Sequence, residues 1–124
     1  MKSWTLTIPA VPPSANVFMR WHWSRRHRLK SQWPVLVSYA LARVAIPKAR
    51  GKRRVRIVIT RRRLIDPANL HLAVDKLLFD DLVSRGILLD DSARWLDYDV
   101  EQRVGGEECT TVEISNAITA RRRL

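Results

Sequence analysis

Acidic residues that could hold a metal ion start abruptly at position 66, directly after the basic run Arg61-Arg62-Arg63. They are Asp66, Asp75, Asp80, Asp81, Asp90 and Asp91. Carboxylates repel phosphate, so their place beside a cationic segment is best explained by a divalent cation lying between acid and phosphate. In such a site Mg²⁺ polarises the phosphate and activates a water molecule for attack. The pattern therefore predicts metal-dependent phosphodiester chemistry.

Each of these carboxylates also has a structural explanation. Asp66 precedes Pro67 and would cap a helix that begins with proline. The acids from 75 to 81 would form a solvated helix face, and Asp90-Asp91-Ser92 would form a turn. Their joint placement favours a shared site, because Asp66 follows one predicted strand and Asp90-Asp91 precedes the next. A helix between them would return the chain, so that both ends meet at one edge of the sheet.

A lysine on the same predicted helix fits this chemistry. Asn69, Lys76 and Asp80 are spaced by 7 and 4 positions, which places them on one helical face. A lysine beside metal-binding carboxylates stabilises negative charge that develops in the transition state. The alternative is a surface ion pair between Lys76 and Asp80, which stabilises a helix by a few tenths of a kcal/mol. No glycine-rich phosphate loop is present, so no nucleotide cofactor is expected.

The net charge of +11 is unevenly distributed along the 124 residues. Residues 1–65 hold 16 of the 23 Lys and Arg and no acid, whereas residues 66–124 hold all 12 Asp and Glu. Such an acid-free half attracts a polyanion, and nucleic acid is the expected partner; the alternatives are a solvated basic face or an anionic membrane. Membrane binding is disfavoured because no helix pairs a basic face with a fully apolar one. No apolar stretch is long enough to predict a membrane span.

Alternating apolar and polar residues predict strands at 4–8, 54–60, 94–104 and 109–116, and helical spacing predicts helices at about 31–45 and 67–85. The last two strands, joined at Gly105-Gly106, form a plausible hairpin. The expected fold is a single α/β (α+β) domain over residues 1–124, with β-α-β-α-β-β order and a mixed four-stranded sheet. It would comprise a basic DNA-binding half (1–65), an acidic catalytic half (66–116) and a basic tail (117–124).

The segment between the first strand and the first helix is expected to be irregular, because it contains three prolines. Basic and aromatic residues interleave in it around Trp21 and Trp23, as a nucleic-acid contact requires. The alternative is that one of these two tryptophans fills the core. The single cysteine, Cys109, cannot form an internal disulfide, which favours the reducing cytoplasm.

An ordered set of short motifs resembles the RusA family of Holliday junction resolvases. The set runs from Pro12-Pro13-Ser14-Ala15-Asn16 through Asp66-Pro67-Ala68-Asn69-Leu70 to Lys76, Asp80, Gly86 and Asp90-Asp91. The resemblance implies a small homodimeric endonuclease with a mixed sheet and flanking helices, dependent on Mg²⁺ or Mn²⁺. It further implies resolution of four-way DNA junctions by paired symmetric nicks in recombination and repair, in a phage, prophage or host pathway. A two-fold enzyme also suits a two-fold substrate.

The resemblance also assigns roles to residues. Catalysis would fall to Asp66, Lys76 and Asp91, and the metal to Asp66, Asp80, Asp90 and Asp91. We expect DNA contacts from Asn16, Arg25, Arg26, Arg53, Arg54, Arg61, Arg62, Arg63 and Asn69. The chain departs from the family pattern in having Ala68 where a carboxylate is usual, and in placing Lys76 about one helical turn late. Asp80 or Asp75 would supply the missing ligand, with Asp80 favoured; the alternative function is a non-catalytic nucleic-acid-binding protein that has lost the metal site.

Overall fold

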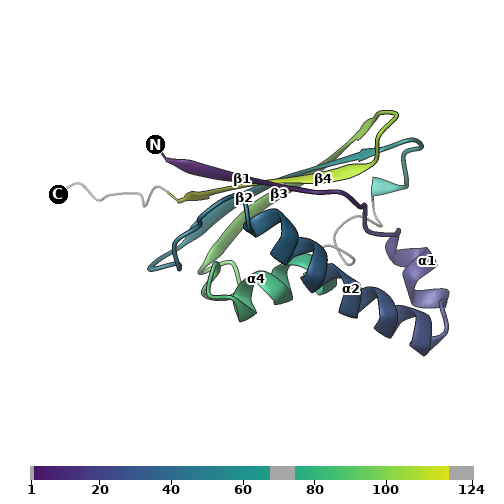
Figure 1. The fold of residues 1–124 in the computed structure, drawn as a ribbon, viewed down its shortest axis with the longest axis horizontal. Coiled ribbons are helices and arrows are strands. Elements are labelled where there is room, and N and C mark those ends of the chain that lie inside the picture. Colours follow the sequence, from purple (N-terminus) through teal and green to yellow (C-terminus); the bar gives the residue numbers. More distant parts are fainter. Residues whose placement is uncertain (1, 68–74, 118–124) are drawn as a thin grey trace.

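The computed structural model describes residues 2–67 and 75–117, with the side chains of Ala15, Asp75 and Lys76 left out. Four strands form one mixed sheet in the order β1-β4-β2-β3. Their bounds are β1 (Ser3–Ile8), β2 (Arg53–Arg61), β3 (Leu96–Val104) and β4 (Cys109–Asn116). All of the described helices lie on one side of this sheet (Figure 1). The predicted α+β class and the mixed four-stranded sheet are therefore confirmed.

Alternation along the strands builds the core, as the sequence predicts. Val55, Ile57 and Ile59 of β2 are fully buried and face the helices. Leu6 and Ile8 of β1 are buried in the same way. The helices contribute the apolar side chains Trp33, Val37, Ala40, Leu77, Leu78, Phe79 and Leu82. The opposite face of the sheet carries charged and hydroxyl side chains, because the strand period of two sends every second residue there.

The predicted hairpin between the last two strands is wrong. β2 lies between β3 and β4, and pairs with β3 in parallel and with β4 in antiparallel orientation. The connection from β3 to β4 therefore passes over the end of β2, where the Gly105 N–H donates to the Arg61 carbonyl at 2.8 Å. A Cβ atom on Gly105 would lie 2.5 Å from Cγ2 of Thr60, so any larger residue at this crossing would force the Thr60 side chain to shift. Gly105-Gly106 therefore lies where the connection from β3 to β4 passes close to the end of β2, and it does not form a hairpin turn.

The segment expected to be irregular contains helical structure. A short helix, α1 (Ala15–Arg20), is capped by Ser14, whose hydroxyl accepts from the Val17 N–H at 3.2 Å. The next helix, α2 (Trp23–Leu41), begins eight residues before the predicted start at 31. The sequence of its first two turns has no apolar residues at helical spacing, because these turns bury no residue completely in the core. A helix could therefore not be predicted there from periodicity. No helix in the described ranges is long and apolar enough to span a membrane.

The second predicted helix, 67–85, is helical where the structure describes it beyond Pro67. A π-helical segment, η2 (Asp75–Phe79), runs into α4 (Asp80–Ser84), and Gly86 follows with a φ of 80°. A left-handed residue of this kind ends a helix, and glycine adopts it without steric cost. Arg85 then ties α4 to α2, because its Nη2 donates to the Pro34 carbonyl and to the Ser38 hydroxyl, both at 2.8 Å.

Candidate nucleic-acid interface and acidic residues

Arg53, at the start of β2, is a buried residue with only 2% of its surface exposed. Its guanidinium donates to the carbonyls of Pro47 at 2.9 Å and Ile87 at 3.1 Å, and to Oδ1 of Asn116 at 3.2 Å. It also lies 5.1 Å from the centroid of the Trp4 ring. Burial lowers the pKa of Arg53. This side chain joins three segments of the chain, so its role is structural.

Arg61 occupies the matching position at the other end of β2 and is 5% exposed. Its Nη2 donates to the Pro12 carbonyl at 2.6 Å, while its buried Nε has no partner among the described residues. Burial lowers the pKa of Arg61 as well. The expectation that Arg53 and Arg61 contact DNA is corrected by this burial, which leaves no surface for a phosphate. Arg53 and Arg61 have the same odd-numbered parity in the strand as buried Val55, so strand alternation alone predicts that their side chains point into the core.

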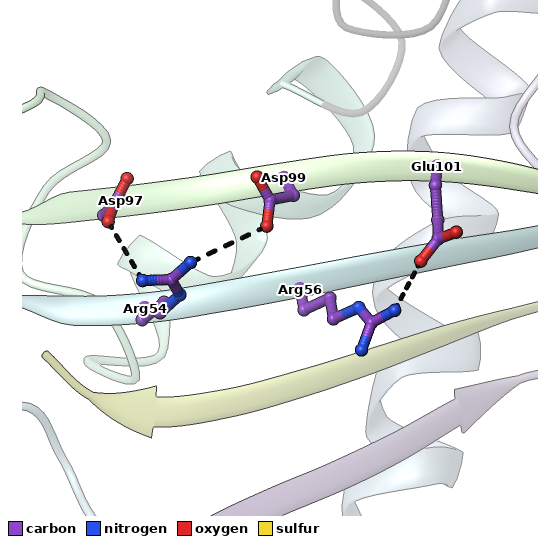
Figure 2. Close-up of polar contacts among 5 residues, drawn as sticks. All are labelled: Arg54, Arg56, Asp97, Asp99 and Glu101. Carbon is purple, nitrogen blue, oxygen red and sulfur yellow. Dashed lines mark hydrogen bonds and ion pairs between the residues drawn. The ribbon is translucent and has the colours of Figure 1, made fainter.

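The other arginines of β2 point to the open face of the sheet and meet acids of β3 (Figure 2). Arg54 lies between Asp97 and Asp99, at 3.7 and 3.9 Å. Arg56 donates to Oε1 of Glu101 at 2.7 Å, and this hydrogen bond lowers the pKa of Glu101 and raises that of Arg56. We call these five residues the ion ladder. Its arginines, including the expected DNA contact Arg54, already have carboxylate partners.

Arg62 and Arg63 follow β2 and are both exposed. Nε of Arg62 donates to the Gly106 carbonyl at 3.2 Å, and its backbone N–H donates to Glu108 at 3.2 Å. These contacts hold the segment against the connection between β3 and β4. Both side chains remain at the surface, where they stay candidates for phosphate contact.

A second basic surface lies where α1 meets α2, and we call residues 20–30 the Trp corner. Its cations are Arg20, Arg25, Arg26, Arg28 and Lys30, and within the described ranges none of them has a carboxylate partner. The guanidinium of Arg25 stacks 3.9 Å above the Trp21 ring. Neither Trp21 nor Trp23 is buried, and the core position is filled by Trp33. Asn16 is exposed on the neighbouring α1.

Asp66, Asp80, Asp90 and Asp91 are exposed, but they lie on different parts of the surface. Asp66 follows β2, where the preceding residue Ile65 is held by two hydrogen bonds with the Gln102 side chain, at 3.1 and 2.6 Å. Asp90 and Asp91 lie in the connection between α4 and β3. Asp80 is exposed in the first turn of α4, whereas its neighbour Asp81 accepts from Nε of Arg85 at 2.8 Å.

The sheet register separates Asp66 from Asp91 within one chain. β2 and β3 are parallel, with Arg53 opposite Leu96 and Arg61 opposite Val104. The connection between them therefore returns the chain to the starting end of the sheet, as Figure 1 shows for α4. Along β3, the distance from Leu96 to Gln102 is about 20 Å. The expectation that both aspartates meet at one edge of the sheet is wrong for a single chain.

The register therefore does not bring Asp66 and Asp91 to one end of the β2–β3 pair within one copy of the chain, where they could share a Mg²⁺. Over the described ranges, no three His, Cys, Asp or Glu side chains lie together in a way that could hold a metal. The predicted helical face formed by Asn69, Lys76 and Asp80 lies partly outside the residues that the structure describes. Asn69 and Ala68 lie outside the described residues, as do the side chains of Asp75 and Lys76.

Models of known protein families do not match the chain, and no curated protein matches it. The family expectation rests on the residue pattern of the chain itself. The charges and exposures described above are the physical support for a function.

Proposed function

We propose that the chain is a structure-selective, Mg²⁺-dependent endonuclease that cuts branched DNA, such as a four-way junction, as a cytoplasmic homodimer. The observation that carries this proposal is the contrast between two sets of acids on a chain of net charge +11. The acids of β3 pair with arginines, whereas exposed Asp90 and Asp91 have no ion pair among the described residues. Carboxylates that remain unpaired beside so many cations are available to a hard divalent ion.

The two aspartates that the RusA-like pattern places in catalysis must then come from two copies. Since Asp66 and Asp91 lie at opposite ends of the β2–β3 pair, one copy's Asp66 has to meet Asp91 of a second copy. A two-fold axis would create two such sites, which is the number that paired nicks require. Mg²⁺ bound there would supply a polarised phosphate and an activated water. The cations of the Trp corner, with Arg62 and Arg63, would bind the DNA backbone, and Lys76 would stabilise developing charge.

The first experiment compares an end-labelled four-way junction with a linear duplex of matched sequence, in Mg²⁺ or in EDTA, on a denaturing gel. We expect symmetric nicks in the junction alone and only with Mg²⁺. Asp91→Asn should retain junction binding and lose cutting. Asp97→Asn is the matched control, because it removes an acid that pairs with Arg54, and it should cut normally.

A mixed dimer tests the assignment of the site to two copies. Asp66→Asn and Asp91→Asn chains, carrying different affinity tags, are expressed together, and the dimer that holds one of each is purified. If each site combines two chains, one of the two sites in the mixed dimer keeps both aspartates, so the mixed dimer nicks one strand of the junction. If each site lies within one chain, both sites are damaged and the mixed dimer is as inactive as either parent.

The rival function is a non-catalytic nucleic-acid-binding protein, and the observation that favours it is Ala68 in place of an expected carboxylate. Tight junction binding by the unmodified protein, with no cutting in Mg²⁺ or Mn²⁺, would establish that function and overturn the endonuclease proposal. Binding weakens with salt in both cases, so salt dependence does not separate them.

A further inference from the structure

Trp23 exposes 66% of its surface, although indole is among the largest apolar groups a chain can bury. It is the first residue of α2, a position for which helix formation needs no aromatic side chain. The neighbouring tryptophans have structural contacts: Trp21 lies 6.0 Å from buried Phe18, and Trp33 belongs to the core. Packing therefore accounts for Trp21 and Trp33, but it does not account for Trp23.

The residue before Trp23 is held in place by the helix start. His22 is the N-cap of α2, and its Nδ1 accepts from the Ser24 N–H at 3.2 Å and lies 2.8 Å from the Ser24 hydroxyl. Its ring centroid is 5.5 Å from that of Trp23, with 36° between the ring planes. A fixed imidazole thus lies beside the indole, which restricts the indole while leaving most of its surface open.

The charges around Trp23 identify the chemistry of a partner. Within the described ranges, the exposed cations Arg20, Arg25 and Arg28 have no carboxylate partner. Nucleic-acid strands offer both features that such a surface matches, since phosphates pair with cations while a base stacks on an aromatic ring. In a duplex the base faces are occupied by neighbouring pairs, so only an unpaired nucleotide presents its flat face.

We propose that Trp23, with His22 beside it and the cations of the Trp corner around it, is a stacking platform for an unpaired base of a DNA strand. A single strand and the exchange point of a branched junction both present such bases. The inference deepens the proposed function and rests on its premise that the chain binds DNA. It does not depend on cutting.

The test measures binding by fluorescence anisotropy in EDTA, with a labelled oligo-dT strand and with a fully paired duplex. Trp23→Ala should weaken strand binding by about 5- to 150-fold, the range for loss of one base stack, and duplex binding by no more than about twofold. The salt dependence should not change, because no phosphate contact is lost. Trp23→Phe should restore most of the affinity. Val35→Ala, which removes another exposed apolar side chain of α2, is the matched control and should bind normally.

Each outcome has a distinct meaning. Equal strand binding by Trp23→Ala and the unmodified protein, or an equal loss on strand and duplex, overturns the platform while leaving DNA binding intact. Failure of the unmodified protein to bind any DNA overturns the proposed function itself. Circular dichroism of Trp23→Ala, together with its duplex binding, separates loss of the platform from loss of the fold.

Discussion

The ion ladder on the open face of the sheet and the Trp corner are both rich in arginine, but only the first supplies carboxylates to match. Arg54 and Arg56 each lie within 4 Å of an acid on β3, whereas Arg25 stacks on an indole and has no carboxylate partner in the described ranges. An arginine already paired has less charge to offer a phosphate, because its field is largely cancelled nearby. Where an arginine sits relative to acids therefore says more about polyanion binding than how many arginines there are.

The largest expected effect distinguishes neighbouring arginines of β2. Arg53→Met should lower the free energy of unfolding by about 2–4 kcal/mol, because it removes the donor to the buried Ile87 carbonyl and to the partly buried Pro47 carbonyl. Arg54→Met removes only exposed ion pairs and should have a much smaller effect. Urea unfolding at pH 7 measures both. A similar loss in the two variants would contradict the structural role given to Arg53.

The central comparison is tested by two double variants. Arg25→Ala with Arg26→Ala should weaken duplex binding on the order of tenfold and reduce the slope of log K against log salt by about 2, since each phosphate contact contributes about 0.9. Arg54→Ala with Arg56→Ala should change that slope little, because these arginines are paired with acids. Titrations between 50 and 200 mM salt provide the slopes. Equal slopes in the two double variants would contradict the proposed difference in DNA binding between the Trp corner and the ion ladder.

Releasing the paired arginines should produce the opposite effect, and a smaller one. Asp97→Asn, Asp99→Asn and Glu101→Gln together leave Arg54 and Arg56 without their carboxylates on β3. We expect DNA binding to become several-fold tighter and its salt slope steeper, as two cations become available. Glu107→Gln with Glu108→Gln is a partial control for the change in net charge. If the two sets tighten binding equally, overall charge is the cause and pairing is not.

The smallest effect concerns the pH dependence of the pair between Arg56 and Glu101. The pKa of Glu101 is lower in the folded protein than its ordinary value of 4.5, so the unfolded chain binds the proton more readily. The pair therefore contributes its full stability above pH 4.5 and loses it as the pH falls through the lower folded pKa. The unmodified protein should be slightly more stable than Glu101→Gln at pH 7 and not at pH 3. Urea unfolding at both values, repeated at high salt, measures this difference.

Local patterns explain what was predictable. The apolar rows of β1, β2 and β4 follow from alternation within each strand, and that alternation also places Arg53 and Arg61 in the buried row of β2. Reading Lys52-Arg53-Arg54 and Arg61-Arg62-Arg63 as basic runs hid this, because a run suggests that all of its members share one environment. Strand parity is the better guide at such positions.

What could not be predicted depends on distant parts of the chain. Gly105-Gly106 suggested a turn between paired strands, but β2 occupies the place between β3 and β4. The separation of Asp66 from Asp91 follows from the parallel pairing of β2 with β3, which periodicity does not report. The start of α2 escaped prediction because its first turns bury no residue completely and so lack an apolar stripe.

The interposed position of β2 has a consequence for how the chain folds. In this sheet, no two hydrogen-bonded strands are joined by a short turn. β1 pairs with β4, so that Ser3 lies opposite Ser115 near the other end of the chain. Long loops must close before such contacts form, which slows folding relative to a protein built from local hairpins. The basic segment 1–65 contains β1 and β2 but not β4, which joins them. Synthesised alone, that segment would lack the strand that completes its sheet, so a growing chain can assemble this sheet only after its acidic half has been made.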